Sequence, residues 1–561
     1  MTAADYAESP GFALSPRAKL EILFATLLAL FLVALDQTVV GVALPVIITE
    51  LQGNELYTWS ITIYLLTSTI SGPIYGKLSD LFGRRPIFMF GVGLFLVASV
   101  LCGLSQEMWQ FVLFRGLQGL GGGAVFPVAI AVVADLYTPA DRGKYLGFFG
   151  AVFGLSSIVG PAIGGIITDN FGWHWIFFVN VPIGLISLVV IFRLLPAIRR
   201  PDAARNIDYV GAALFTAAIA PILIGLSNRQ AADWADPWVG GMILLGLVFL
   251  GVFLWWESRF PEPIVPLSLF RIRTFTISVI AMFMAAIGFF TAIVFLPRWF
   301  QVVGGASATE SGYQVLPMLG ALIVSATLSG QIVARTGKYK AIIFGSLVLL
   351  ALGLFLMTGL HADTDRPLLW LWMLLVGLGI GPSFAIFTLI VQNSVSARDI
   401  GVASSNLSFF QQIGGTIGLT IAGTIFASKL TEEIPRQLVV AGVPQQFVSQ
   451  FQQQGADPNL DITGTGDLGA RILASVPDEF KGFVEPLIPN IVAGIHEAFS
   501  VAIGSMVWIG IAGAIIAAIA VLFLKETPMR TTWEMPEPEP EPDPDAAASP
   551  SGRSEEAPVG G

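Results

Sequence analysis

Apolar stretches long enough to cross a bilayer as a helix recur along the whole of this 561-residue sequence. A spanning helix needs roughly 20 mostly apolar residues. Charged residues are only 12% of the chain, against about 25% in soluble domains. The chain is therefore predicted to be an all-α polytopic membrane protein. The fourteen predicted spans are 20–47, 55–75, 86–104, 107–134, 142–168, 174–196, 207–226, 237–256, 274–303, 309–334, 339–360, 367–394, 399–428 and 495–524.

The positions of lysine and arginine predict the orientation of these spans. With both termini in the cytoplasm, 20 of the 29 such residues fall in cytoplasmic segments, and the short outer loops hold Arg229, Arg298 and Arg366. Positive residues favour the cytoplasmic side, so we expect a multi-pass protein of the cell (inner or plasma) membrane with both termini cytoplasmic. The net charge of −10 says little about the membrane body, because eight acids outnumber Arg553 by seven between Glu534 and Glu556.

Two segments are too polar to enter the bilayer. Residues 429–494 are rich in Gln, Gly and Pro and are expected on the outer surface, partly as short amphipathic helices, while the Pro- and acid-rich tail is expected to be disordered. The predicted organisation is a cytoplasmic N-terminus (1–19), a six-helix half (20–196), a linker with an inserted helical hairpin (197–256), spans 9–13 of a second half (257–428), a long extracytoplasmic loop (429–494), span 14 (495–525) and a cytoplasmic tail (526–561).

An internal repeat supports this division into halves. "GKLSDLFGRR" begins at Gly76 and "GQIVARTGKYK" begins at Gly330, and each follows an apolar helix and ends in basic residues. If the seventh and eighth spans are an inserted hairpin, both stretches follow the second helix of a six-helix half. Parallel repeats of this kind build many secondary transporters, whose substrate site lies between the halves.

Five motifs then point to one family. "LDQTVVGVALP", "GKLSDLFGRRP", "LFRGLQGLGGG", "GLSSIVGPAIGG" and "WHWIFFVNVPIG" occur in order over the first six spans. The chain resembles the major facilitator superfamily, and within it the fourteen-span drug:proton antiporters of the QacA/EmrB type, over roughly residues 20–428 and again at span 14. The resemblance implies two six-helix halves with an inserted two-helix hairpin. It also implies alternating access, driven by the proton gradient without a cofactor.

Asp36 lies inside the first apolar stretch, where an ionised side chain costs at least about 2.5 kcal/mol. The cost falls if the carboxyl group takes up a proton or faces a cavity between the halves. Arg115 is the only basic residue deep in a predicted span. At ~1.5 Å per residue, Asp36 lies about 16 Å and Arg115 about 12 Å below the outer ends of their spans. We predict that they form a proton-coupling pair. A permanent structural ion pair is the alternative.

The stretch "GKLSDLFGRRP" is predicted to form a tight cytoplasmic turn. Asp80 is placed to accept hydrogen bonds from the start of a neighbouring helix, where the helix dipole favours an anion. The resemblance implies that this helix begins near Arg398–Ile400 and that the contact latches the outward-open state. Ala334 replaces Asp80 in the second copy, so only the first half should carry a full latch. The predicted latch residues are Gly76, Asp80, Gly83, Arg84 and Arg85.

The fifth span carries the motif that the resemblance associates with antiporters. Small residues at this spacing let helices approach closely, and a proline removes one helical hydrogen bond. The resemblance implies that the motif seals the cavity against proton leak, whereas ordinary tight packing is the alternative. Its residues are Gly154, Gly160, Pro161, Gly164 and Gly165.

Aromatic residues are candidates for an apolar substrate cavity, although core packing would explain them as well. They are Tyr64, Phe148, Phe149, Phe289, Phe290, Phe384 and Phe409. Asp208 stands at the entrance of the hairpin, where capping of a helix is favoured over proton coupling.

The leading hypothesis is a proton-coupled exporter of amphipathic small molecules, whose partners are the lipid bilayer, its substrate and protons. The alternative cargo is an endogenous lipid, siderophore or metabolite, with a protein partner docking on residues 429–494. Neither an enzyme nor a nucleic-acid binder is expected, because no nucleotide-binding or hydrolase motif occurs. No metal site is expected either, and with Cys102 as the only cysteine there is no intrachain disulfide.

Overall fold

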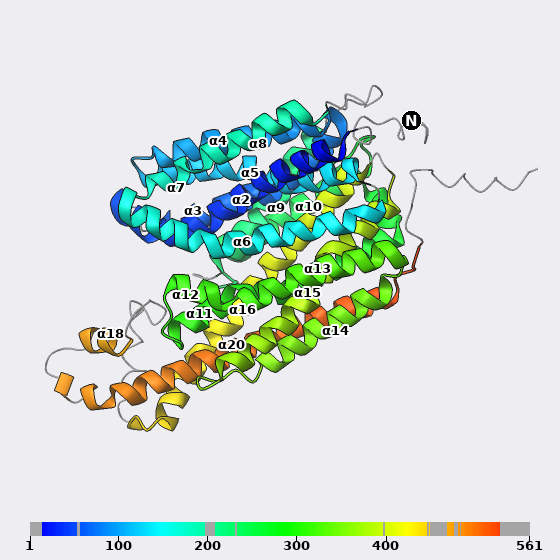
Figure 1. Cartoon of the computed structure of the whole chain (residues 1–561). Helices are drawn as coiled ribbons and strands as arrows, with labels where there is room; N and C mark the ends of the chain where they lie inside the picture. Colours follow the sequence, from blue (N-terminus) through cyan, green and yellow to red (C-terminus); the bar gives the residue numbers. More distant parts are fainter. Residues whose placement is uncertain are drawn as a thin grey trace, which may run out of the picture.

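The computed structural model shows long helices running side by side in one bundle (Figure 1). The predicted N-terminal segment up to residue 13, much of the outer segment between 446 and 467, and the acidic tail from 528 onward lie outside the described residues. The described residues are 14–52, 56–137, 139–196, 208–229, 233–396, 399–445, 448, 468–475, 481–482 and 484–527.

The N-terminal half contains six passes through the bundle. We call the face where α2 begins and α20 ends the terminal face, and the other end the opposite face. Ser15 caps the start of α2, and Pro16 takes the first helical position, where no backbone donor is needed. The helices are α2 (Pro16–Leu51), α3 (Tyr57–Phe82), α4 (Arg84–Gly103), α5 (Met108–Leu136), α6 (Pro139–Phe171) and the sixth pass, which consists of α7 (His174–Phe178) and α8 (Asn180–Leu194).

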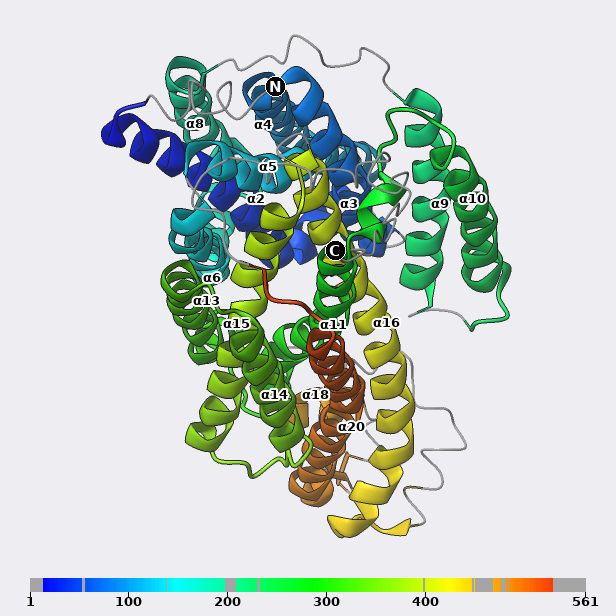
Figure 2. The same ribbon diagram turned by 90° about the vertical axis from the view of Figure 1, so that its right-hand side faces the viewer.

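The inserted hairpin consists of α9 (Tyr209–Asn228), the short π-helix η2 (Pro237–Gly241) and α10 (Met242–Glu257). It stands at the edge of the bundle, and α9 contacts α3 of the first half and α16 of the second (Figure 2). Residues from all of these helices share one apolar cluster, including Leu66, Phe215, Phe253 and Phe409. The hairpin therefore packs on both halves.

The C-terminal half supplies the other six passes. It begins after the 3₁₀ turn η3 (Leu267–Arg271), and a short helix, α12 (Ala308–Gln314), lies between its first two passes. The long helices are α11 (Arg273–Val302), α13 (Leu316–Thr336), α14 (Lys340–Met357), α15 (Arg366–Ser394), α16 (Ile400–Val440) and α20 (Ile488–Leu522). The predicted fold class, with two six-helix halves and an inserted hairpin, is confirmed.

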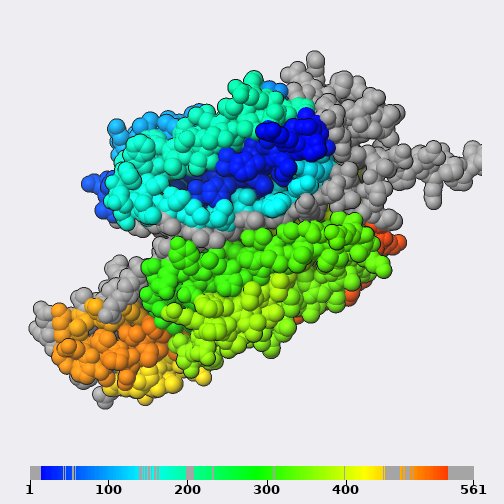
Figure 3. All heavy atoms as spheres, in the orientation of Figure 1, coloured from blue at the N-terminus to red at the C-terminus, as the bar shows by residue number. Residues whose placement is uncertain are grey.

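Twelve helices among the described residues are long and apolar enough to cross a membrane. The remaining two of the fourteen predicted passes are α3 and α6, which run through the bundle in the same way. The two halves form stacked layers in the space-filling view, with α18 (Leu468–Ser475) projecting at one end (Figure 3). Each half has its own buried apolar core, the larger one in the C-terminal half.

At the opposite face, α16 continues to Val440, past the predicted end of its span at residue 428. Hydropathy falls at Lys429, but a helix can continue in water when an apolar stripe finds a partner. Here Leu438 on α16, Ile472 on α18 and Ile491 on α20 belong to one buried cluster. The outer segment thus contains a small packed cap, built on the ends of two membrane helices.

Candidate functional site

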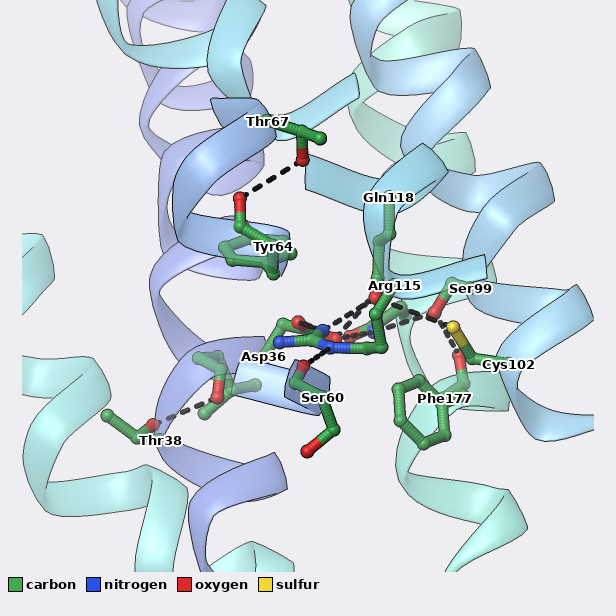
Figure 4. A network of polar contacts seen from close by, with 12 residues as sticks. Asp36, Thr38, Ser60, Tyr64, Thr67, Ser99, Cys102, Arg115, Gln118 and Phe177 are labelled. Atoms are coloured by element: carbon green, nitrogen blue, oxygen red, sulfur yellow. Dashed lines mark hydrogen bonds and ion pairs between the residues drawn. The ribbon is translucent and has the colours of Figure 1, made fainter. Parts of the chain in front are cut away.

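The centre of the N-terminal half holds a buried ion pair. Nη1 of Arg115 on α5 lies 2.5 Å from Oδ2 of Asp36 on α2 (Figure 4). The side chains are 3% and 1% exposed. The regular rise of a helix placed these residues at similar depth, and the structure shows that the rotation of the two helices also brings them face to face. Burial without water makes the attraction strong, but it also makes any unpaired charge here costly.

Two neutral amides complete the shell around the carboxylate. Gln118, one turn after Arg115, accepts from Arg115 Nη1 at 2.6 Å and donates to Asp36 Oδ1 at 2.8 Å. Asn180 at the start of α8 donates to the same oxygen at 3.1 Å and to Ser99 Oγ at 2.9 Å. The carboxylate therefore accepts three hydrogen bonds from two helices besides its own. A proton can reach it only if one of these donors withdraws.

The sequence analysis missed Gln118, Asn180 and Ser99. Gln118 had a readable signal, because residues three apart share a helix face. Asn180 had another, since Pro182 cannot donate to the preceding turn, and the sixth pass is divided just before Asn180. Ser99 donates to the carbonyl oxygen of Phe177 at this break. The break thus supplies two groups that position the asparagine.

An aromatic ring and a backbone carbonyl cover the other side of the cation. The guanidinium carbon of Arg115 lies 4.3 Å from the ring centroid of Tyr64 on α3, a cation–π contact strengthened by desolvation. Arg115 Nε also points to the carbonyl oxygen of Ser60, at 3.5 Å. Tyr64, predicted as a cavity residue, lies against the ion pair, and α3 is thereby connected to α2 and α5.

The antiporter motif packs directly on the helix that carries Asp36. A side chain at Gly160 of α6 would overlap the hydroxyl of Thr38, and one at Gly164 would lie within 3.2 Å of the Val39 backbone. Thr38 Oγ1 also donates to the carbonyl oxygen of Ser156 at 3.1 Å. Gly154 and Pro161 belong to α6, and nothing further is described at their positions. The close approach fixes α6 against α2 two to three residues from the ion pair.

We expect Gly160→Ala to destabilise the protein, because the added methyl group must push α6 away from Thr38. Overpacking of this kind costs about 1–3 kcal/mol. Gly165→Ala is the matched control, since a side chain there would enter open space. Thermal unfolding in detergent and efflux in cells should both be impaired for Gly160→Ala only. Equal behaviour of the two variants would show that this approach is not needed.

A second polar cluster joins the halves at the terminal face. Asp80 Oδ2 accepts the backbone N–H of Val402 in the first turn of α16 at 2.8 Å. Arg84 forms ion pairs with Asp80 and, through Nε at 3.0 Å, with Asp135 of α5. The helix start that Asp80 contacts is the predicted one, although Arg398 lies outside the described residues. The N-terminus of α16 favours this anion through its dipole and free N–H groups.

Glycines bring these helices together. A side chain at Gly76 of α3 would overlap Ser405 of α16, and one at Gly401 would meet the Asp80 carboxylate. Gly83 adopts a φ of +93° between α3 and α4, which favours glycine. Arg85 points away from the cluster, over the ring of Phe192 on α8 at 4.6 Å. In the second copy of the repeat, Gly337 has a φ of +69°, so the turn is retained although Ala334 replaces the acid.

Arg142 forms another contact between the halves that the sequence analysis did not single out. This residue of α6 is fully buried. Its guanidinium group donates to the carbonyl oxygens of Ala134 at 2.6 Å and Tyr137 at 3.1 Å, and Nη1 lies 3.3 Å from Gln392 Oε1 on α15. In the sequence it was only one of the positive residues that set orientation. Its burial could not be read from its position at the start of a helix.

Asp80→Ala should release the terminal face. Losing one partner of a buried ion pair costs about 3–5 kcal/mol, and 3 kcal/mol corresponds to a roughly hundredfold change in the closed-to-open ratio. Spin labels at Phe82 and Thr336, exposed equivalents that end α3 and α13, would report the distance in a Cys102→Ser background. Asp399→Ala is the control, because Asp399 accepts from Ser396 instead. An unchanged distance distribution for Asp80→Ala would refute a latch.

The other predicted cavity aromatics fall into separate groups. Phe289 of α11 has its ring centroid 5.5 Å from that of Phe290 and 5.7 Å from that of Phe384. Phe409 packs on Phe215 of the hairpin, with centroids 5.1 Å apart. In the N-terminal half, Phe149 packs edge-to-face on Phe126, and Phe148 is 43% exposed. The trio in the C-terminal half is the one set that the structure brings together.

Among the described residues, His, Cys, Asp and Glu form no group of three that could hold a metal ion. Comparison with known proteins indicates a different chemistry. Residues 26–419 match the model of the Major Facilitator Superfamily. The chain is 36% identical to Multidrug transporter protein MdtP of Bacillus subtilis (strain 168) over 504 residues, which cover 89% of this chain and 92% of that protein.

Two further similarities agree with this match. The chain is 32% identical to Multidrug resistance protein 3 of the same organism over 517 residues, 92% of this chain and 96% of that protein. Its structure superposes on the proton:xylose symporter XylE bound to 6-bromo-6-deoxy-D-glucose with a TM-score of 0.57 at 15% identity, covering 93% of this chain and 99% of the other. The second similarity shows the fold alone.

Proposed function

Since this chain belongs to the major facilitator superfamily of membrane transporters and not to an enzyme family, we propose that it exports amphipathic small molecules, such as drugs, in exchange for protons. The observation that carries the proposal is the buried Asp36–Arg115 pair. Ionisable residues inside membrane helices are rare and usually mark proton or substrate pathways. The multidrug transporters to which the chain is similar support the substrate class.

The geometry suggests how a proton would act. The Asp36 carboxylate connects its own helix to α5 through Arg115 and to α8 through Asn180. A proton on Asp36 would remove the charge that holds Arg115 and one acceptor position. The helices could then shift, and return of Arg115 would expel the proton. In this proposal Asp36 carries the proton and Arg115 controls its release.

Alternating access requires that the halves open at one face at a time. In this structure, contacts from Asp80 and Arg142 join the halves at the terminal face. We propose that this face is cytoplasmic, because most positive residues lie there, and that the protein resides in the cell membrane. The conformation described here would then be closed toward the cytoplasm, and release of the latch would admit substrate.

The proposed energy source is the proton gradient, without a cofactor. One proton moving through about 140 mV supplies about 3 kcal/mol, or about two decades of substrate concentration. Among the described residues, the other buried acids are Asp80, Asp208, Glu257 and Glu433. They lie toward helix ends, away from the ion pair. A single central carboxylate suits neutral, zwitterionic or singly charged substrates.

The test is energised efflux of a fluorescent monovalent cation from an efflux-deficient bacterium. Cells expressing the chain should lose the loaded dye faster than cells without it, and a protonophore should remove the difference. If the difference survives the protonophore, proton coupling is wrong. If correctly inserted protein gives no efflux of a panel of amphipathic dyes, the drug-exporter proposal is wrong.

The cap at the opposite face favours one alternative. Leu438, Ile472 and Ile491 belong to a packed cluster beyond the membrane helices, and drug export by itself does not require such a structure. Export of an endogenous lipid, siderophore or metabolite, with a protein partner docking on residues 429–494, would use it. Replacing 441–487 with a short linker should leave dye efflux intact under the main proposal and abolish export under the alternative.

A further inference from the structure

The turn that carries the latch is also connected to the inserted hairpin. Lys77 of α3, three residues before Asp80, forms an ion pair of 2.8 Å with Glu262 in the linker after α10. The two side chains are 11% and 13% exposed, so water screens this pair only partly. Any movement of the end of α3 must therefore break this pair or pull the linker along with it.

Glu257, the last residue of α10, holds that linker in place. Its Oε1 accepts the backbone N–H groups of Ile264 at 3.2 Å and Val265 at 3.4 Å. These residues follow Glu262 closely, so the carboxyl group of Glu257 positions the partner of Lys77. The sequence gave no reason to single out Glu257, because an acid beside Arg259 at the end of a span resembles an ordinary surface residue.

The surroundings of Glu257 are unfavourable for a negative charge. The residue is 3% exposed, and its Oε2 has no hydrogen-bond partner among the described groups. Asp208 from the start of α9 and Lys77 from α3 are the charged groups that act on it most strongly. Asp208 is itself 2% exposed, and Lys77 is paired with Glu262, the remaining charge on the linker. Three carboxyl groups thus share one cation.

Asp208 is the acid of this group that remains stable as a carboxylate. It accepts the Gly211 N–H at 2.6 Å, which caps α9, and the indole N–H of Trp256 at 2.9 Å. The favoured capping role is what the contacts show, although the residue is buried and not on the surface. Glu257 has no such donor for its second oxygen. Burying an unpaired carboxylate beside a like charge costs more than burying the neutral acid.

We propose that Glu257 is a second proton-binding site, occupied while the terminal face is closed and emptied when it opens. Release of the latch moves Lys77 away from Glu262, and Lys77 can then pair with Glu257 and displace its proton. Because Glu257 lies at the terminal face, its proton exchanges with that compartment only and is not carried across. A low pH on this side stabilises the closed latch, and a high pH favours its release.

This proposal relies on the proposed alternating-access function, but its first test does not require transport. The full-length protein in detergent is studied by infrared spectroscopy, which detects the carbonyl stretch of a protonated carboxyl group. The band should be present at neutral pH in the wild type and in Asp36→Asn, and it should be lost in Glu257→Gln. A band that persists unchanged in Glu257→Gln overturns the proposal, because Glu257 would then be ionised.

The second test measures the latch itself. Spin labels at Phe82 and Thr336 are placed in a background with Cys102→Ser and Asp36→Asn, so that the central pair does not titrate. The closed population should fall as pH rises, and it should stay high at all pH values in Glu257→Gln, which mimics the neutral acid. Lys77→Met should also remove the pH dependence. An equal pH dependence in Glu257→Gln overturns the proposal, whereas absence of efflux in the earlier assay would affect only the proposed function.

Discussion

Replacing Asp36 with asparagine should abolish proton-driven efflux while substrate exchange across the membrane continues. Asparagine has almost the same shape and can still accept a hydrogen bond from Arg115, but it cannot take up a proton. The proposed coupling supplies about 3 kcal/mol for each proton at about 140 mV. Without it, the substrate gradient that the protein maintains should fall about a hundredfold. The measurement is dye accumulation in inside-out vesicles energised by respiration.

The design separates a lost proton carrier from a damaged protein. Exchange of labelled for unlabelled substrate across the vesicle membrane needs alternating access but no net proton movement, so Asp36→Asn should retain it. Asp169→Asn is the matched control, because Asp169 is an exposed acid near the end of α6 and its loss should change neither assay. Full active transport by Asp36→Asn would leave the ion pair with a structural role only.

Helix geometry explains which parts of this site could be predicted. The rise per residue gave the depth of Asp36 and Arg115, and the orientation of the spans gave the side of Asp80. Whether two residues at equal depth face each other depends on helix rotation, which packing decides. Gln118 and Asn180 therefore could not be assigned to the site, since uncharged amides in a span can face lipid, a neighbour or a cavity at similar cost.

The same limit applies to the ends of the helices. Hydropathy places the end of a span where charges begin, and it missed the continuation of α16 because the apolar stripe there is buried by α18 and α20. It also treated Arg142 and Glu257 as end residues in contact with water. Both are buried because other segments cover them, Arg142 beside α15 and Glu257 beneath its linker. Long-range packing of this kind has no signal in the local sequence.

Arg115→Met should be the most destabilising single change in the centre of the protein. It leaves the Asp36 carboxylate buried with Gln118 and Asn180 as its remaining donors, and removing one partner of a buried ion pair costs about 3–5 kcal/mol. Thermal inactivation in detergent should show the loss. Adding Asp36→Asn should recover much of it, because the double variant has no buried charge. Losses that simply add would contradict a coupled pair.

The pH dependence of the Arg115→Met variant tests the same coupling from the side of the proton. In the wild type Arg115 balances the charge of Asp36, whereas in the variant burial favours the neutral acid in the folded state. Near neutral pH the folded variant then binds a proton that the unfolded chain does not. Stability falls with pH wherever the folded state binds more protons, so the variant should be more stable at low pH and lose stability as pH rises. The Asp36→Asn/Arg115→Met double variant, which has no acid at this position, should not show this slope. A variant as pH-independent as the double would mean that Asp36 remains ionised without its cation, and the carboxyl group could not then serve as a proton carrier controlled by Arg115.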